Sequence, residues 1–350
     1  MKKVITLFIT CLLMFVFVTP HVYAKNDNVP FSVRAILPDN QVDKNVSYFN
    51  IEMAKGDTQD LPVELYNSSS NPVHLVIDRH FAATNSNGII TYDGSIKKHD
   101  ASMKYPFEKI SSIAQKEVTL SPGQTTTIHI KVQAPQKAFD GTILGGIYIK
   151  QKQDQQGANQ GVQIQNQYAY AIAVQIQEKD NNTKVKPDLK LNDVKATTID
   201  KRTGAQTDFL NPTATIIKNL KFKGSVYKQG SDKALYARQV NDFDVAPNNR
   251  FHFPIMFDNQ EIKPGKYTFK GSAQNKDHRW TFEKDFTVTD KDAKKANDDA
   301  IELDKGISIW WFIIPIALLI AIIVFIIYLR KRNRKHNRGE THETFNEESS

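Results

Sequence analysis

The sequence predicts an all-β fold of two immunoglobulin-like β-sandwich domains in series, followed by one transmembrane helix. Three observations predict it. Short runs of alternating apolar and polar residues recur between turn clusters over 29–288, whereas amphipathic helix patterns are scarce. A Pro-led turn followed by such a run occurs twice, as SPGQTTTIHIKV at 121–132 and as APNNRFHFPIMF at 246–257. The segment 307–329 is apolar and carries no charge.

The N-terminus has the three parts of a secretory signal peptide. Lys2 and Lys3 are followed by an apolar stretch, and Val22-Tyr23-Ala24 is a small-residue cleavage signature. We predict a signal peptide over 1–24, cut between Ala24 and Lys25; the alternative is an uncleaved anchor. The only cysteine, Cys11, lies inside this segment, so cleavage leaves a chain without disulfides or a cysteine nucleophile. An exported protein of this kind fits a Gram-positive bacterium better than a eukaryotic cell surface.

The first sandwich is predicted over 29–179. Residues 151–167 are rich in Gln and poor in apolar residues, and we interpret them as an exposed loop before the last strand; the alternative is an interdomain linker. The predicted strands are 31–37, 48–54, 61–67, 72–80, 88–93, 127–135, 141–150 and 168–176.

The second sandwich is predicted over 187–289. The stretch 178–188 is charged, rich in Asn and closed by Pro187, which is typical of a domain boundary. Residues 290–306 have no β pattern and are predicted to be a short stalk before the membrane. The strand-like segments are 189–199, 207–212, 216–230, 234–247, 251–257, 265–274 and 279–288.

The two copies of the repeated element have similar surroundings. Pro122 and Pro247 each stand six residues before an apolar position expected to face inward. Gly141 follows Pro122 by 19 residues and Gly265 follows Pro247 by 18, and each glycine opens a further strand pattern. This spacing indicates that the two domains share one architecture.

Residues 307–329 are long enough to cross a membrane, since 23 helical residues extend about 35 Å. Trp310, Trp311 and Tyr328 lie near the two ends, as in an aromatic belt. The following 330–338 holds six Lys or Arg, so we predict that the tail 330–350 is cytoplasmic and that the sandwiches are outside. We interpret this basic run as topogenic; the alternative is a specific lipid or cytosolic partner.

The charge of the exported part excludes nucleic acid as an expected partner. The whole chain has a formal net charge of +8, but much of this lies in the signal peptide and the tail. Residues 25–306 hold 38 Lys and Arg against 34 Asp and Glu, a net charge of only +4. A mildly basic surface of this kind lacks the electrostatic footprint of a nucleic-acid-binding protein.

No catalytic motif is visible in the sequence, so we predict no enzyme, no catalytic residues, no cofactor and no metal site. Asp78 and His80 share a strand face, and we interpret them as a surface ion pair, with a functional site as the alternative. Two carboxylate pairs lack a visible cleft; they are Asp242 with Asp244 and Asp298 with Asp299.

The interpretations of Trp280 and of Pro254 each leave an alternative open. Trp280 is interpreted as a core residue, the alternative being an exposed ring that stacks on sugars. Pro254 cannot donate to a ladder, so the strand around it is predicted to lie at a sheet edge or to be bulged. The edge either protects against aggregation or meets a protein partner, and the candidate partner-binding residues are Phe251, Phe253, Pro254 and Ile255.

The order of the motifs resembles the WxL-interacting proteins of low-GC Gram-positive bacteria. In the first domain the resemblance rests on FSVRAILPDNQVDKNVSYFNIEMAKGDTQDLPVELYN, LSPGQTTTIHIKVQAP, GTILGGIYI and YAYAIAVQI. In the second it rests on PDLKLNDVKATTIDKRTGAQTDFLNP, VAPNNRFHFPIMF, IKPGKYTFKG and WTFEKDFTV.

This resemblance implies a membrane-anchored scaffold on the Gram-positive cell surface. Its partners would be peptidoglycan through the first domain, host matrix or serum proteins through the second, and secreted WxL-domain proteins. Two other classes remain as alternatives. A cell-wall or glycan-processing enzyme requires a carboxylate or His cluster in a cleft, and a single-span receptor requires a signalling role for the 21-residue tail.

Overall fold

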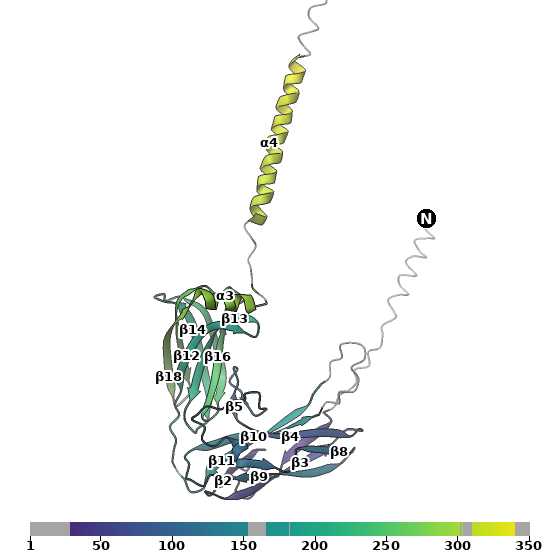
Figure 1. Ribbon diagram of the computed structural model, residues 1–350, viewed down its shortest axis with the longest axis vertical. Helices are drawn as coiled ribbons and strands as arrows, with labels where there is room; N and C mark the ends of the chain where they lie inside the picture. Colours follow the sequence, from purple (N-terminus) through teal and green to yellow (C-terminus); the bar gives the residue numbers. More distant parts are fainter. Residues whose placement is uncertain (1–28, 153–165, 182, 302, 304–309, 340–350) are drawn as a thin grey trace, which may run out of the picture. The chain divides into compact units, whose positions relative to one another are not determined.

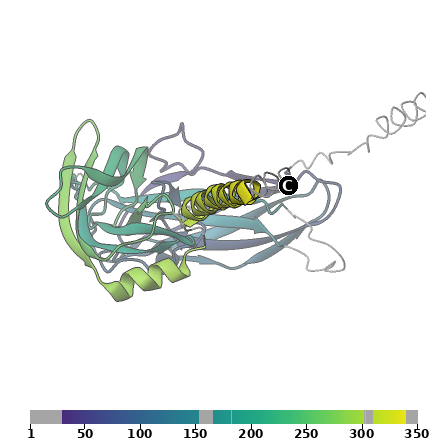
Figure 2. The ribbon, with the colours of Figure 1, turned by 90° about the horizontal axis from the view of Figure 1, so that it is seen from above.

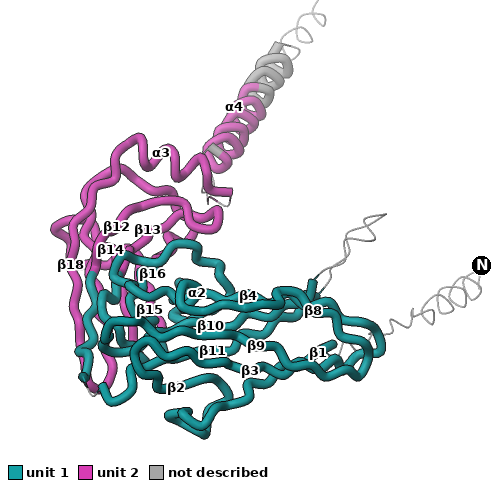
Figure 3. The backbone as a smooth tube through the Cα atoms, turned by 60° about the horizontal axis from the view of Figure 1, so that its bottom comes forward, with its two compact units in different colours: residues 1–190, 210–219, 242–251 teal, residues 191–209, 220–241, 252–350 magenta. Residues whose placement is uncertain are grey.

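The computed structural model describes residues 29–152, 166–181, 183–301, 303 and 310–339. It confirms the predicted fold class, since the chain is mostly β-strand arranged as sheets in two domains, with one apolar helix near its C-terminus (Figure 1). The chain forms two compact units (Figure 3). Unit 1 comprises residues 1–190, 210–219 and 242–251, and unit 2 comprises 191–209, 220–241 and 252–350.

Several predictions fall on residues that the structure does not describe. They are the signal peptide with its cleavage site at Ala24 and Lys25, most of the Gln-rich 151–167, and the end of the tail at 340–350. The predicted domain boundaries also stay predictions.

The first sandwich consists of two sheets whose strands pair antiparallel except for β2 with β11, which are parallel. One sheet has the order β1 (Phe31–Ala35), β3 (Thr58–Asn67), β9 (Thr125–Gln133) and β7 (Ser111–Ile113). The other has the order β2 (Phe49–Met53), β11 (Ala169–Glu178), β10 (Thr142–Gln151), β4 (Val73–Phe81) and β8 (Glu117–Leu120).

The first copy of the repeated element forms β9, and its alternation sets the packing. Ile128 and Ile130 are at most 2% exposed, while His129 and Lys131 are exposed to solvent. In the register of β3 and β9, Ile128 lies opposite Val63 and Ile130 opposite Leu61. These side chains belong to one continuous core that includes residues of both sheets, so the period-2 pattern buries one face of each sheet.

Two consecutive glycines in β10 allow aromatic rings to approach the strand from both faces. A Cβ on Gly145 would lie 2.2 Å from the Cβ of Phe107, which comes from the short helix α2 (Phe107–Ile110). A Cβ on Gly146 would lie 2.5 Å from the Cβ of Tyr92. Successive strand residues point to opposite faces of the sheet. The absence of a side chain at Gly145 and Gly146 therefore leaves room for one aromatic ring on each face. Burial raises the pKa of the Tyr92 hydroxyl to about 12.

A small hairpin, β5 (Ala83–Thr84) and β6 (Ile90–Thr91), is tied to the distant segment 242–251 within unit 1. The backbone N–H of Thr84 donates to Oδ1 of Asn249 at 2.8 Å, and the Thr84 hydroxyl accepts from the N–H of Ala246 at 2.8 Å. All three residues are buried, so these bonds satisfy groups that water cannot reach.

The second sandwich also has two sheets. One has the order β12 (Lys190–Ile199), β13 (Arg202–Asn211) and β16 (Asn249–Met256). The other has the order β15 (Ala234–Val245), β14 (Ile217–Lys228), β17 (Gly265–Gln274) and β18 (Arg279–Val288).

Phenylalanine rings fill the part of this core that lies in unit 2. The ring of Phe222 is 5.0 Å from that of Phe209 and 4.6 Å from that of Phe253, and the ring of Phe282 is 5.0 Å from that of Phe209. Ring pairs with edge-on or tilted geometry at these distances stabilise a fold by more than the burial of their apolar surface alone.

Ten of the residues predicted as a stalk form helix α3 (Asp290–Asp299), which lies beside the strands of the second sandwich (Figures 1 and 2). Thr289 caps it by accepting from the N–H of Asp292 at 3.1 Å. Ala293 and Ala296 are buried, and the Thr198 hydroxyl donates to the carbonyl of Ala296 at 2.8 Å. Two small residues give a weak apolar stripe, which is why the sequence pattern did not predict this helix.

Helix α4 (Trp310–Gly339) contains the predicted span. Among the described residues it is the one helix long and apolar enough to cross a membrane, with a mean hydropathy of 3.0 over Trp311–Tyr328. The helix continues into the basic run, so the charges of 330–338 follow the apolar segment without a break in the helix.

A buried asparagine holds the repeated element of the first sandwich in place. Asn67 ends β3 and is 0% exposed. Its Nδ2 donates to the carbonyls of Asn71 at 2.8 Å and of Leu120 at 3.0 Å, just before the SPGQ turn. Its Oδ1 accepts from both the N–H and the hydroxyl of Ser69, at 2.9 and 2.8 Å.

The second sandwich repeats this arrangement bond for bond. Asn211 ends β13 and is 0% exposed. Its Nδ2 donates to the carbonyls of Thr215 at 2.8 Å and of Ala246 at 2.9 Å, just before Pro247. Its Oδ1 accepts from the N–H and the hydroxyl of Thr213, at 3.1 and 2.7 Å. Each asparagine therefore makes four side-chain hydrogen bonds: three to the turn that follows its strand and one to a carbonyl shortly before the proline of a repeated element.

Replacing either asparagine should destabilise its sandwich. Asn211→Ala removes four bonds and leaves the buried Ala246 carbonyl without its partner, so we expect the free energy of unfolding to fall by about 3 kcal/mol. Asn67→Ala should cost a similar amount. Chemical denaturation followed by circular dichroism measures both. The control is the exposed Asn45→Ala, which should change stability by less than about 0.5 kcal/mol. Equal stability of all three variants would contradict the role given to the asparagines.

Candidate binding surfaces

The strand that contains Pro254 is at a sheet edge, because β16 is the last strand in the order β12-β13-β16. Of the candidate partner-binding residues, Phe251, Phe253 and Ile255 are at most 2% exposed, and Pro254 is partly exposed. A partner would therefore reach this strand through its backbone and its outward side chains. That the edge meets a partner stays a prediction.

An arginine from the neighbouring β15 lies against this edge. The guanidinium of Arg238 is 4.7 Å from the centroid of the Phe253 ring, and its Nη1 donates to the carbonyl of Pro254 at 3.1 Å. Burial lowers the pKa of Arg238, although a guanidinium stays charged. The Pro254 carbonyl of the edge strand is therefore already bonded within the chain. An edge carbonyl that is bonded in this way is less available to an unwanted partner strand.

Asp78 and His80 form the predicted surface pair on β4, with Oδ2 of Asp78 3.6 Å from Nε2 of His80. The nearby Asp93 accepts from the N–H and hydroxyl of Ser95 at 3.0 and 2.8 Å. Burial acts to raise the pKa of Asp93, but these hydrogen bonds and the adjacent His80 outweigh it and lower the pKa. In the described part of the chain, no group of three or more His, Cys, Asp or Glu could hold a metal ion.

The remaining sequence candidates do not converge on a site. Asp244 accepts from the N–H of Asn219 at 2.8 Å and so supports a turn, while Asp298 and Asp299 end helix α3. Trp280 is half-buried, and its ring is 5.6 Å from that of His278. Its exposure is therefore intermediate between that of a core residue and that of a fully exposed ring.

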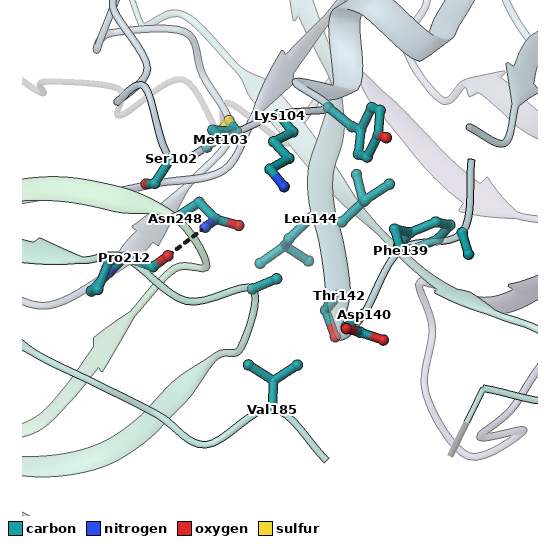
Figure 4. Close-up of a pocket in the computed structure, with 14 residues that line it drawn as sticks. Ser102, Met103, Lys104, Phe139, Asp140, Thr142, Leu144, Val185, Pro212 and Asn248 are labelled. Atoms are coloured by element: carbon teal, nitrogen blue, oxygen red, sulfur yellow. Dashed lines mark hydrogen bonds between the residues drawn. The ribbon is translucent and has the colours of Figure 1, made fainter. Parts of the chain in front are cut away.

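Unit 1 contains a cavity of about 370 Å³, shown in Figure 4. Charged and amide side chains line it, from Lys104, Asp140 and Asn248. Lys104 directs its ammonium group into the space, and Asp140 and Thr142 lie on a different side of it (Figure 4). The apolar lining comes from Met103, Tyr105, Ala138, Phe139, Ile143, Leu144, Val185, Pro212 and Ala214. Small-molecule sites are commonly of this size and composition.

Hydrogen bonds fix two walls of the cavity. The N–H of Thr142 donates to the carbonyl of Ala214 at 2.7 Å, and Nδ2 of Asn248 donates to the carbonyl of Pro212 at 2.9 Å. Gly141 has a φ of 77°, and a Cβ there would lie 2.1 Å from the Ala214 carbonyl oxygen. Only glycine combines that backbone angle with so close an approach.

A second cavity of about 370 Å³ adjoins the first, since both are lined by Phe139, Thr142, Val185 and Ala214. Its further polar lining includes Glu178, Asn181 and Lys184. Asn181 links the two cavities, because its Nδ2 donates to the carbonyl of Phe139 at 2.9 Å and to Oδ1 of Asp140 at 3.0 Å.

Sequence reasoning did not find these cavities. Lys104 and Tyr105 lie in the 15-residue connection 92–106 between β6 and α2, of which only 92 and 93 belong to a predicted strand. The length of that connection is the available signal, because connections longer than about 12–15 residues are commonly functional. The lining also combines residues that are more than 100 positions apart, which no short motif records.

Comparison with protein families gives two matches that together cover most of the chain. Residues 31–151 match the peptidoglycan binding domain of the WxL Interacting Protein, and residues 159–298 match its host binding domain. The second match begins before β11, which pairs with β10 and β2 of the first sandwich. A comparison with curated proteins gave no match.

Solved structures resemble the chain only weakly. The chaperone YadV has 12% identity, covers 74% of this chain and 100% of its own, and has a TM-score of 0.29. The E. coli chaperone DraB has 15% identity, coverages of 74% and 98%, and a TM-score of 0.27. The Acinetobacter baumannii CsuC–CsuE complex has 8% identity, coverages of 64% and 89%, and a TM-score of 0.30. These TM-scores are too low to carry an argument about this chain.

The identity of the chain thus rests on the family matches, which name the two domains in the order that the motifs predicted, and on an architecture of two sandwiches and one apolar helix. The chain belongs to the WxL-interacting protein family.

Proposed function

We propose that this chain is a membrane-anchored scaffold of the Gram-positive cell surface that binds peptidoglycan, host proteins and WxL-domain proteins without catalysis. The observation that carries the proposal is the pair of family matches to a peptidoglycan binding domain and a host binding domain. The WxL partner follows from the family's name, and anchoring is supported by the apolar segment Trp311–Tyr328 with its basic continuation.

The short connection to the membrane bears on this proposal. Residues 300–309 separate α3 from α4, and ten residues span at most about 35 Å when fully extended. The proposed host-binding sandwich would therefore stand close to the membrane, beneath the wall. Assembly with a secreted WxL-domain protein would extend the reach of the complex beyond the wall.

Purified full-length chain in detergent should co-sediment with peptidoglycan sacculi and bind a purified WxL domain. The expected result is saturable binding in both assays, measured by sedimentation and by calorimetry. A single-span membrane protein without these domains, in the same detergent, is the control. If the chain neither sediments with sacculi nor binds the WxL domain, the scaffold function is wrong.

Deleting residues 307–350 should release the chain into the culture medium. The deletion removes the apolar helix, and no other described helix is long and apolar enough to span a membrane. Immunoblots of medium and membrane fractions measure the distribution. Replacing only residues 340–350 is the control and should leave the chain in the membrane fraction. Retention of the 307–350 deletion in membranes would show that another segment anchors the protein.

Arg238→Ala tests the proposed partner edge. If a partner strand pairs with β16, Arg238 competes for the Pro254 carbonyl, so its removal should tighten binding of the WxL domain severalfold. Gln239→Ala on the same strand is the matched control. Unchanged or weaker affinity of Arg238→Ala, with normal thermal unfolding, would argue that the edge is protected rather than used.

A further inference from the structure

We propose that the cavity beside Lys104 binds the carboxylate-bearing end of a short peptide, namely the peptide stem of peptidoglycan, rather than its sugar chain. This inference rests on the proposed function, because it names the part of peptidoglycan that the first cavity recognises.

The polar lining suits a ligand that carries both a carboxylate and amide or amine groups. Lys104 presents its ammonium group to the cavity, and the described residues include no ion-pair partner for it (Figure 4). Asp140 has one carboxylate oxygen bonded to Asn181, which leaves the other oxygen for a ligand donor. Asn248 uses its Nδ2 on the Pro212 carbonyl, so its Oδ1 is oriented as an acceptor. The C-terminal end of a peptide offers a carboxylate for Lys104 and backbone N–H donors for the oxygens of Asp140 and Asn248.

The aromatic lining does not suit a sugar ring. Stacking on a pyranose requires the exposed flat face of an aromatic side chain. Here the rings of Tyr105 and Phe139 contact each other, with centroids 6.2 Å apart and planes inclined by 63°. Phe139 is only 8% exposed. The two rings therefore form an apolar wall, as would suit the methyl group of an alanine residue.

The walls are rigid before a ligand arrives. Ala214 and Pro212 are held by bonds from Thr142 and Asn248, and the segment that contains them begins at the buried Asn211. A preformed site loses little conformational freedom on binding, which favours affinity for a small ligand. The adjoining second cavity, with Glu178 and Lys184, offers a continuation for the rest of the stem.

The test measures binding of synthetic stems to the full-length chain in detergent by calorimetry. The probes are the tetrapeptide L-Ala-γ-D-Glu-L-Lys-D-Ala with a free terminal carboxylate, the same peptide with a C-terminal amide, and chitotetraose as a sugar without peptide. Wild type should bind the free carboxylate most tightly. Lys104→Ala should weaken that binding by about tenfold or more, since it removes a charge-assisted hydrogen bond. Ala138→Trp, which places a bulky ring in the lining, should also weaken it.

Lys109→Ala is the matched control, because Lys109 is an exposed lysine nearby in the chain that does not line the cavity. It should bind like wild type, and thermal unfolding should show all variants folded. The inference is overturned if Lys104→Ala binds the free carboxylate like wild type, if the amide binds wild type equally well, or if chitotetraose binding depends on Lys104. Sacculi that bind wild type while the tetrapeptide does not would overturn the inference alone. Failure of wild type on sacculi counts against the proposed function instead.

Discussion

The hydrogen bonds of one buried, strand-ending asparagine in each sandwich, Asn67 and Asn211, are the interaction on which much of the structure depends. Asn67 and Asn211 each end a strand and bond to the turn that follows it and to the carbonyl just before the repeated Pro-led turn. An amide suits this position because it has two donors and an acceptor with two lone pairs. In a site without water each bond replaces one that the unfolded chain makes to solvent, and losing a partner leaves a buried group unsatisfied.

Each copy of the repeated sequence element begins beside one of these asparagines. The repeat of a Pro-led turn and an alternating strand was visible in the sequence, and so were the fold class and most strands. The bonds that position each copy were not visible, because Asn67 and Leu120 are 53 residues apart and Asn211 and Ala246 are 35 apart. Period-2 patterns report which face of a strand is buried, but they carry no information about which distant carbonyl an amide will meet.

The candidate sites, like the fold, were only partly predictable from the sequence. Proline chemistry correctly placed β16 at a sheet edge, because a residue without an N–H is tolerated there. The covering of that edge by Arg238 depends on tertiary packing and could not be predicted. The cavity was missed because its charged residues lie in connections without strand periodicity. Helix α3 was missed because only Ala293 and Ala296 mark its buried face, and alanine gives little contrast in a hydropathy pattern.

The asparagine in the second sandwich also shapes the cavity in unit 1. Its bonds to Thr213 and Thr215 fix the turn that contains Ala214, whose carbonyl accepts from Thr142. On the other side of that turn, Nδ2 of Asn248 donates to the Pro212 carbonyl at 2.9 Å, and the backbone N–H of Asn248 donates to the Thr213 carbonyl at 2.9 Å. The group that stabilises the fold is thus the group that sets the position of the cavity wall. A change at Asn211 would therefore alter ligand binding through geometry as well as through stability, whereas Asn67, whose bonds lie elsewhere in unit 1, would affect stability without moving this wall.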